Sequence, residues 1–275
     1  MSLDVLLTGA YGRVGTAIID NLVGTEEYSF TLLDRTDHES HDTFQADVAD
    51  LEAIRPAFEN QDAVYHLAGY PETDGTYQEV LENNIIGTYN ALEAAREGEV
   101  ETFVFASTNH VVGMYEVENA PEIYYPDFGL LVDHTSTRRP DSYYGTSKSF
   151  GEDLGRYYVE NFDYPKQFYA LRIASVRHSE YDHPYGDAEH GVDRGDWERG
   201  SEQYETMVAR MKAMWQSRRD HAHMVEQCIK DDDVEFDVFY GVSDNDRRWF
   251  DIDHAREVID YEPRDNGEEW DSPPE

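Results

Sequence analysis

The chain has 275 residues, enough for one large domain with a full hydrophobic core. Its formal net charge is -37, from 59 acidic residues against 22 lysines and arginines. This balance argues against nucleic acid or an anionic membrane surface as a partner, because phosphate binding needs clustered cations. The carboxylates are spread along patterned segments, as in proteins of a high-salt cytoplasm, where molar salt shortens the Debye length to about 3 Å.

The single cysteine, Cys228, excludes an internal disulfide and favours a reducing compartment. The sequence shows no signal segment and no apolar run of membrane-spanning length. We therefore expect a soluble, cytoplasmic protein without a membrane partner.

The first predicted strand, residues 4–7, leads directly into a glycine-rich turn and a helix. Gly9, Gly12 and Gly15 follow it with Gly-x-x-Gly-x-x-Gly spacing, and apolar residues continue at helical spacing from Val14. In a dinucleotide site, Gly9 would permit the turn, Gly12 would admit a pyrophosphate, and Gly15 would pack the helix on the sheet. A purely structural turn can have the same glycine spacing. The end of the next strand helps to distinguish a dinucleotide-binding turn from a structural one.

That second strand, residues 29–33, ends at Asp34, about 20 residues after the glycines. A carboxylate at this point would bind the ribose hydroxyls and oppose a 2′-phosphate, so NAD is expected rather than NADP. The neighbouring Arg35 could soften this preference. A third strand is expected to end at residues 46–48, where Asp47 is either an adenine ligand or a solvated loop residue.

A helix over residues 51–58 and a strand over residues 63–69 are predicted next. The small residues that end this strand suit the close passage of a cofactor. His66 lies in an apolar stretch and is interpreted as a core histidine. Residues 78–97 predict a long helix, in which Asn84 is expected to make a structural hydrogen bond. One side of that helix carries Leu81, Ile85, Tyr89 and Leu92.

The fifth strand, residues 102–106, is followed by a hydroxyl side chain, Thr108. Because ligands of parallel sheets bind beyond the carboxyl ends of the strands, Thr108 is a candidate for contact with a reacting oxygen. Residues 115–139 are mixed in character and contain prolines, and we expect them to form a loop over the active site.

Tyr144 and Lys148 are one turn apart on one face of a helix predicted over residues 141–161. A nearby ammonium group lowers the pKa of a phenol, which is about 10 in a free tyrosine. A shift to about 7 would make Tyr144 a general base for a sugar hydroxyl.

After a sixth strand over residues 167–173, the composition changes. Residues 177–200 predict a mobile or salt-adapted insertion, and the final residues predict a loose tail. The histidines here and further on lack a ligand pattern such as His-Glu-x-x-His, so no metal site is expected. Between these segments we expect helices within 205–230, a strand over 234–240 and a helix over 252–259.

Strands that alternate with helices indicate an α/β fold, a Rossmann-type doubly wound parallel sheet with a small C-terminal substrate lobe. We expect an NAD-binding part with the catalytic residues over 1–174 and a substrate-binding part over 175–275, within one integrated domain.

The glycine pattern, Asp34, Thr108, Tyr144 and Lys148 together resemble the extended short-chain dehydrogenase/reductase family. Residues 105–110, Phe-Ala-Ser-Thr-Asn-His, are similar to the Phe-Ala-Ser-Ser-Asn-His stretch of uronate dehydrogenases and of haloarchaeal NAD-dependent glucose-6-phosphate dehydrogenases. The likeness continues over 172–175, 210–220 and 241–246. Thr108 and Ala174 replace a Ser and a Gly, and a long insertion after Ser175 departs from the uronate enzymes.

The resemblance implies Tyr144 as base, Lys148 as its pKa modifier and ribose ligand, and Thr108 as the hydrogen-bonding hydroxyl. It implies a sugar site formed by Ser107, Asn109, His110, Ser175 and Arg210. The predicted NAD site also contains Tyr144 and Lys148. Its other residues are Gly9, Tyr11, Gly12, Arg13, Val14, Gly15, Asp34, Arg35, Asp47, Val48, Leu67, Ala68, Gly69 and Asn84.

The expected reaction is NAD-dependent oxidation of an aldose at C1 to its lactone, with an anionic sugar, a uronate or a hexose 6-phosphate, bound by Arg210. Arg218 and Arg219 either add to a phosphate site or are solvated surface residues. The alternatives are a nucleotide-sugar epimerase or dehydratase with tightly bound NAD, and a non-catalytic NAD-sensing protein. From the resemblance alone, a homodimer is expected through the helices at 78–97 and 141–161.

Overall fold

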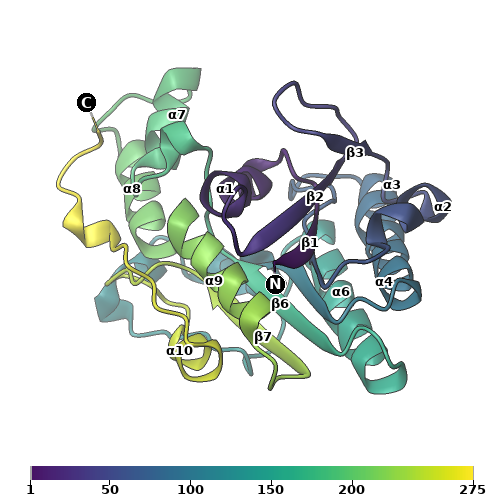
Figure 1. Cartoon of the computed structure of the whole chain (residues 1–275). Helices are drawn as coiled ribbons and strands as arrows, with labels where there is room; N and C mark the ends of the chain where they lie inside the picture. Colours follow the sequence, from purple (N-terminus) through teal and green to yellow (C-terminus); the bar gives the residue numbers. More distant parts are fainter. Residues whose placement is uncertain (1, 275) are drawn as a thin grey trace.

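A computed structural model describes residues 2–274 of the chain. At its centre lies a parallel sheet of seven strands in the order β3-β2-β1-β4-β5-β6-β7 (Figure 1). The sheet confirms the predicted doubly wound α/β fold, and the strand order reverses between β1 and β4, where such folds bind their ligands. The strands are β1 (Leu3–Thr8), β2 (Tyr28–Asp34), β3 (Thr43–Gln45), β4 (Ala63–His66), β5 (Thr102–Thr108), β6 (Gln167–Ile173) and β7 (Phe236–Gly241).

Ten α-helices are present within residues 2–274, and a π-helical segment, Leu81–Ile86, joins the third to the fourth. They are α1 (Arg13–Leu22), α2 (Leu51–Ile54), α3 (Tyr77–Val80), α4 (Gly87–Glu97), α5 (Met114–Asn119), α6 (Tyr143–Asn161), α7 (Gly186–Arg194), α8 (Glu202–Met214), α9 (Arg218–Lys230) and α10 (Asp253–Ile259). None of these helices is both long and apolar enough to cross a membrane.

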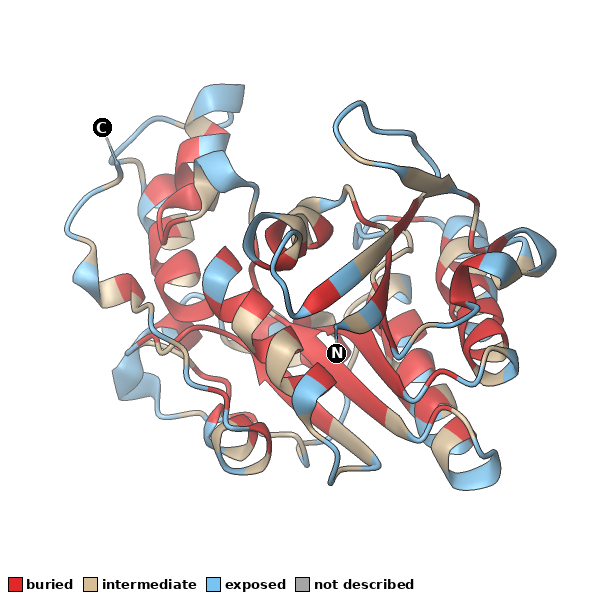
Figure 2. Cartoon of the chain, viewed as in Figure 1, coloured by how far each residue is buried: buried red, intermediate tan, exposed pale blue. Residues whose placement is uncertain are grey.

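The two faces of the sheet bury alternate residues of each strand. Val5 and Leu7 pack on the face covered by α1 and α9, whereas Leu6 packs on the face covered by α2, α4 and α6 (Figure 2). Each fully buried valine or leucine contributes about 1.5–3 kcal/mol relative to an exposed one. The central strands β4 and β5 are buried at every residue, as strands covered on both faces are, whereas β2 and β3 at one edge of the sheet are only partly buried.

Residues after 174 contribute both to the sheet and to a separate lobe. β7 pairs with β6, and α9 packs beside α1. In contrast, α7 and α8 lie together beyond the sheet, at the upper left of Figure 1. The boundary expected at 174 therefore does not separate two independent cores.

Two segments expected to be loose are ordered. Within residues 177–200, α7 is fixed by Trp197, whose Nε1 donates to Ala188 O at 2.9 Å, and by Glu189, which binds Tyr204 at 2.5 Å. In the tail, the carbonyl of Trp270 accepts a hydrogen bond from Lys212 at 2.9 Å. Within residues 177–200, Arg177 pairs with Asp187 and Arg199 pairs with Glu189, which agrees better with the salt-adapted alternative than with the mobile one.

The predicted apolar side of the helix over 78–97 is correct only in part. Leu92 is buried, but Tyr89 is 46% exposed, and the buried side also carries Asn84 and Thr88. The π-helical segment explains the difference, because its extra residue rotates the following turns relative to an ideal helix.

Residues 115–139 do not form a loop over the active site. They contain α5 and two short 3-10 turns, and Ile123 and Val132 pack in a cluster with Met214 of α8 and Phe250. None of these residues lines the cavity described below. The prolines interrupt the segment without leaving it unpacked.

Candidate functional site

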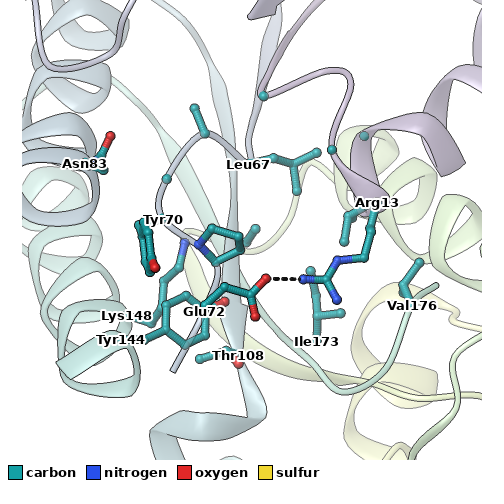
Figure 3. A pocket seen from close by; sticks show the side chains of 18 of the residues that line it. Arg13, Leu67, Tyr70, Glu72, Asn83, Thr108, Tyr144, Lys148, Ile173 and Val176 are labelled. Atoms are coloured by element: carbon teal, nitrogen blue, oxygen red, sulfur yellow. Dashed lines mark hydrogen bonds and ion pairs between the residues drawn. The ribbon is translucent and has the colours of Figure 1, made fainter. Parts of the chain in front are cut away.

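A cavity of about 670 Å³ opens at the carboxyl ends of the central strands. Its walls come from the turn after β1, the residues after β4, the end of β5, the start of α6 and the residues after β6. This position is the crevice at the reversal point of the sheet, where α/β folds bind dinucleotides. Figure 3 shows the part of the cavity around Tyr144 and Lys148.

The glycine-rich turn leaves the cavity floor without side chains. Gly9 has a φ of +69°, and a Cβ added there would lie 2.8 Å from Ala68 N. A Cβ on Gly15 would lie 2.4 Å from Ala10 O, whereas one on Gly12 would meet nothing closer than 3.4 Å. Gly12 also offers no side chain to cap α1, so the first amides of this helix stay available to an anion. The turn fits a pyrophosphate.

The Asp34 carboxylate lies at the end of β2 on the cavity wall. Its Oδ2 accepts a hydrogen bond from Tyr11 N at 3.2 Å, and its Oδ1 accepts one from Thr36 Oγ1 at 3.0 Å. These bonds fix a carboxylate that fits a pair of ribose hydroxyls. Arg35 also lines the cavity, but its guanidinium is turned toward Asn83 Oδ1, at 3.4 Å.

Two residues of the predicted NAD site do not line the cavity. Asp47 binds the amide of Ala49 at 2.9 Å and so fixes the turn after β3. Asn84 lies behind the wall, where its side chain pairs with both backbone groups of Tyr70, at 2.6 and 3.1 Å, and with Ser147 Oγ at 3.0 Å. The structural hydrogen bond predicted for Asn84 is confirmed. The other predicted NAD-site residues line the cavity.

Tyr144, Lys148 and Thr108 meet at the cavity wall (Figure 3). Ser142 caps the helix α6 by accepting a hydrogen bond from Gly145 N at 3.1 Å. The two side chains that follow at helical spacing therefore point the same way, and Lys148 Nζ lies 5.8 Å from the centre of the Tyr144 ring. Lys148 is buried and also lies 4.8 Å from the centre of the Phe105 ring.

Burial dominates the pKa values of this pair. Burial raises the pKa of Tyr144, and the hydrogen bond with Thr108 and the charge of Arg13 offset this only in part. Burial lowers the pKa of Lys148 to about 8. Desolvation therefore outweighs the hydrogen bond from Thr108 and the charge of Arg13, and the fall in the Tyr144 pKa that the sequence predicts stays a prediction.

An ion pair crosses the cavity above Tyr144. Arg13 of α1 donates to Glu72, in the segment after β4, at 2.8 Å, and Figure 3 shows the two side chains pointing toward each other. The charge of Glu72 raises the pKa of Tyr144, and that of Arg13 lowers it. Glu72 could not be predicted from the sequence, because no pattern links it to the glycine-rich turn.

The predicted sugar-site residues all line the cavity, but their side chains differ in availability. The Ser107 hydroxyl is turned away from it and donates to Glu152 at 2.6 Å. Glu152 forms a buried ion pair with Arg172, at 2.8 Å, so Ser107 belongs to a structural network. In contrast, Asn109 Nδ2 is buried without a hydrogen-bond partner in residues 2–274, as expected of a ligand-binding donor. His110 is held by Asp141 at 2.7 Å.

The arginines of the substrate end are paired with acids. Arg210 lines the cavity and donates to Glu116 at 2.6 Å. Arg177, which the sequence did not single out, lines it too and is paired with Asp187. Ser175 lies between them in the wall and is 1% exposed.

Arg218 and Arg219 do not take part in a phosphate site. Arg218 pairs with Asp20 at 2.5 Å and donates to the carbonyls of Arg13 and Arg177, which ties α9 to α1. Arg219 pairs with Asp265 at 2.7 Å on the surface. Neither lines the cavity. Of the two alternatives, a solvated surface residue fits Arg219, whereas Arg218 is 6% exposed and fits neither.

His66 is a core histidine, as predicted, but only one of its two nitrogens is paired, because Nε2 is buried without a hydrogen-bond partner in residues 2–274. Its Nδ1 lies 2.8 Å from Thr8 Oγ1, and burial lowers its pKa to about 3. Within residues 2–274, no group of three or more histidine, cysteine, aspartate or glutamate side chains is arranged to hold a metal ion.

Comparisons with known proteins agree with this geometry. The model of the NAD dependent epimerase/dehydratase family matches residues 5–226. An NAD-dependent glucose-6-phosphate dehydrogenase of Haloferax volcanii is 39% identical, with 98% of this chain and 96% of the relative covered. An L-arabinose 1-dehydrogenase (NAD(P)(+)) of that organism is 34% identical, with 95% and 96% covered. The crystal structure of glucuronic acid dehydrogenase from Chromohalobacter salexigens has a TM-score of 0.75 and 31% identity, with 98% of this chain and 87% of that chain covered.

Proposed function

This chain belongs to the NAD dependent epimerase/dehydratase family, and we propose that it is an NAD-dependent sugar dehydrogenase that oxidises an aldose at C1 to its lactone. The observation that carries the proposal is the meeting of Tyr144, Lys148 and Thr108 in the cavity that begins at the glycine-rich turn. A scaffold protein has no use for this combination, and two relatives that match 98% and 95% of this chain are named as sugar dehydrogenases.

The residues that would hold NAD are those that fit its parts. The amides of the first turn of α1 and the bare glycines would bind the pyrophosphate, and Asp34 would bind the adenosine ribose. Leu67, Ala68 and Gly69 would form the wall beside the dinucleotide. Lys148 would bind the hydroxyls of the nicotinamide ribose. When bound, NAD supplies the acceptor for a hydride.

Tyr144 would act as the general base. It takes the proton of the C1 hydroxyl while the hydride leaves C1, and C1 becomes the carbonyl carbon of the lactone. Thr108 would hydrogen-bond to the same oxygen and hold it beside the phenol. Lys148, protonated below its pKa of about 8, would stabilise the phenolate that must form first. Positioning of the sugar by Asn109 and His110 would supply much of the remaining acceleration.

The proposed substrate is an anionic aldose, such as glucose 6-phosphate or a uronate. Arg210 supports this choice, because its guanidinium lines the cavity in a chain with few cations. The relatives include enzymes named for a sugar phosphate and for a uronic acid.

We propose a high-salt cytoplasm as the working environment. The net charge of -37 and the Haloferax volcanii relatives support the salt, and the lone, buried Cys228 suits a reducing compartment. Thermal unfolding in dilute buffer and in molar KCl tests the salt dependence, and we expect a lower unfolding midpoint in dilute buffer. Equal midpoints would contradict it.

We also propose a homodimer formed through the exposed side of α3, α4 and α6. Large apolar side chains gather there, and the Tyr77 and Tyr143 rings lie 5.6 Å apart, centre to centre. Tyr89 and Tyr157 are 46% and 51% exposed. Sedimentation of the wild type and of Y89D and Y157D tests whether the protein is a dimer through this surface. The wild type should sediment as a dimer, and the two variants should sediment as monomers. A monomeric wild type would contradict the proposal.

The decisive experiment measures NADH formation in molar KCl with glucose 6-phosphate, glucuronate, galacturonate, glucose, arabinose and a UDP-sugar. Turnover of one of the free aldoses, with a lactone as product, is expected. Turnover of the UDP-sugar alone would favour an epimerase or dehydratase, and NAD binding without any turnover would favour a sensing protein.

A further inference from the structure

We infer that Arg177 and Arg210 together bind the phosphate group of a sugar phosphate, and that Asp187 positions the two arginines for it. The inference rests on the proposed function and narrows its substrate from any anionic aldose to a phosphorylated one. It assigns a role to α7 and the residues before it, which the sequence suggested were a mobile or salt-adapted insertion.

A single oxygen atom connects the two guanidinium groups. Asp187 Oδ2 lies 2.6 Å from Arg177 Nη2 and 3.7 Å from Arg210 Nη1. Arg177 Nε donates to the other oxygen of Asp187, so this arginine is held by two bonds. Two guanidinium groups side by side repel each other, and the shared carboxylate offsets that repulsion.

The acids stand behind the arginines with respect to the cavity. Arg177 and Arg210 line it, whereas Asp187 and Glu116 do not. Glu116 takes up Nε and Nη2 of Arg210, at 2.6 and 3.5 Å. An entering ligand therefore meets guanidinium N–H groups before it meets a carboxylate.

N–H groups remain for a ligand on both arginines. Arg210 Nη1 makes no hydrogen bond with any of residues 2–274. Arg177 Nη1 makes one, to Val176 O at 3.1 Å, and keeps a second hydrogen. The remaining N–H groups therefore come from two different guanidinium groups, both of which lie next to Asp187 Oδ2.

Two planes suit a phosphate better than a carboxylate. A carboxylate has two oxygens and is satisfied by the fork of one arginine. A phosphate monoester has three terminal oxygens and a charge of about -2 at neutral pH, so it can use donors from two arginines at once. The charges of the two arginines and of the two acids behind them sum formally to zero. Selectivity between a phosphate and a carboxylate therefore depends on how many N–H donors each anion can reach.

The experiment compares R177Q and D187N with two control variants from the same segment. In R199Q the arginine removed is 63% exposed and pairs with Glu189, and in D193N the acid removed binds Tyr181, both outside the cavity. The readout is the ratio of kcat/KM for glucose 6-phosphate to kcat/KM for glucose in molar KCl, with glucuronate as the carboxylate substrate.

R177Q should lower the ratio of glucose 6-phosphate to glucose by about 10- to 100-fold, the effect of losing a hydrogen bond to a charged group. It should lower the corresponding ratio of glucuronate to glucose by less than about threefold. D187N should raise KM for glucose 6-phosphate and the inhibition constant of inorganic phosphate, with kcat retained, as expected of a positioning residue. R199Q and D193N should match the wild type.

A wild type that prefers glucuronate to glucose 6-phosphate would overturn the inference, and so would equal losses of both anionic substrates in R177Q. Loss of kcat without a change in KM in D187N would also contradict it. If R177Q does not fold, R177K tests the same point, because lysine keeps the charge but lacks the fork. A wild type that oxidises none of the aldoses would instead refute the proposed function.

Discussion

The two ends of the cavity are built in different ways. The end next to β1 and β2 is made mainly of backbone: bare glycines, uncapped amides at the start of α1, and one carboxylate, Asp34, held by local hydrogen bonds. The end next to β6 and α8 is made of charged side chains that pair over long distances in the sequence, as Arg210 does with Glu116. The end made of backbone suits a ligand whose shape varies little among related enzymes. The end made of side chains can acquire a different ligand when a few of those side chains are substituted.

Between the two ends lies the proposed catalytic group, and its removal should have the largest effect. Y144F removes the oxygen that accepts the proton and leaves the ring in place. We expect kcat to fall by about 10²- to 10⁴-fold, the usual contribution of a general base, with NAD affinity within about threefold of wild type. Steady-state rates and NAD titration by fluorescence measure the two quantities. Y125F, at an exposed tyrosine that does not line the cavity, is the control, and substantial activity in Y144F would refute the assignment.

The difference between the ends also explains what the sequence could predict. Gly9, Gly12, Gly15 and Asp34 were predictable because each has its role at a fixed distance from a strand end, and backbone geometry enforces that distance. The same holds for the pair on α6, whose helical spacing is visible in the sequence.

The substrate end could not be predicted in this way. Arg177 and Asp187 are ten residues apart in a segment without periodicity, and nothing in the sequence shows that they pair. Ser107 was misassigned for the same reason, because its partner Glu152 lies on another element. The charge composition suggested solvated acids, but ion pairing decides which acids are buried.

A pair of glycine substitutions separates the two roles of the backbone end. G12A adds a methyl group with no contact closer than 3.4 Å, so the fold should be unchanged while NAD affinity falls about tenfold or more. G15A places a Cβ 2.4 Å from Ala10 O and should destabilise the fold by about 1–3 kcal/mol, the usual cost of overpacking. Thermal unfolding and NAD titration of both variants check this. Unchanged NAD affinity in G12A would argue against a pyrophosphate at this turn.

The pKa values of Tyr144 and Lys148 predict an alkaline optimum. At pH 7 both groups hold their protons, because the pKa of Tyr144 is raised and that of Lys148 is about 8, so the phenol cannot act as a base. As the pH rises through about 8, the pair loses one proton, most of it from Lys148. The form with a phenolate beside an ammonium group is the minor tautomer of the resulting charge state, so its population rises with pH below about 8 and is constant above it. We expect kcat/KM to rise about tenfold per pH unit below pH 8 and to level off above it.

The control for this profile is K148R. Because arginine stays charged, the limb near pH 8 should disappear, and the remaining rise should follow Tyr144 alone at higher pH. A wild-type profile that is flat between pH 6 and 8 would show that the bound ligands change these pKa values more than burial does.

The smallest expected effect concerns the ion pair that crosses the cavity above Tyr144, Arg13 with Glu72. The pair is exposed, with side chains 37% and 56% accessible, so it stabilises the chain by about 1 kcal/mol at most, and by less in molar salt. E72Q should nevertheless have two effects, one on NAD binding and one on the pKa of Tyr144. It releases Arg13 toward the anion site at the start of α1, and it removes a charge that raises the pKa of Tyr144.

E72Q should therefore raise NAD affinity by no more than about fivefold and shift the rising limb of the pH profile to lower pH. Both effects should be larger in dilute buffer than in molar KCl, because salt screens exposed charges. E101Q is the matched control, since Glu101 forms a similarly exposed pair with Lys166 away from the cavity. Weaker NAD binding in E72Q would mean that Glu72 holds the cavity in shape for the dinucleotide, and the ion pair would then support the site rather than compete with its ligand.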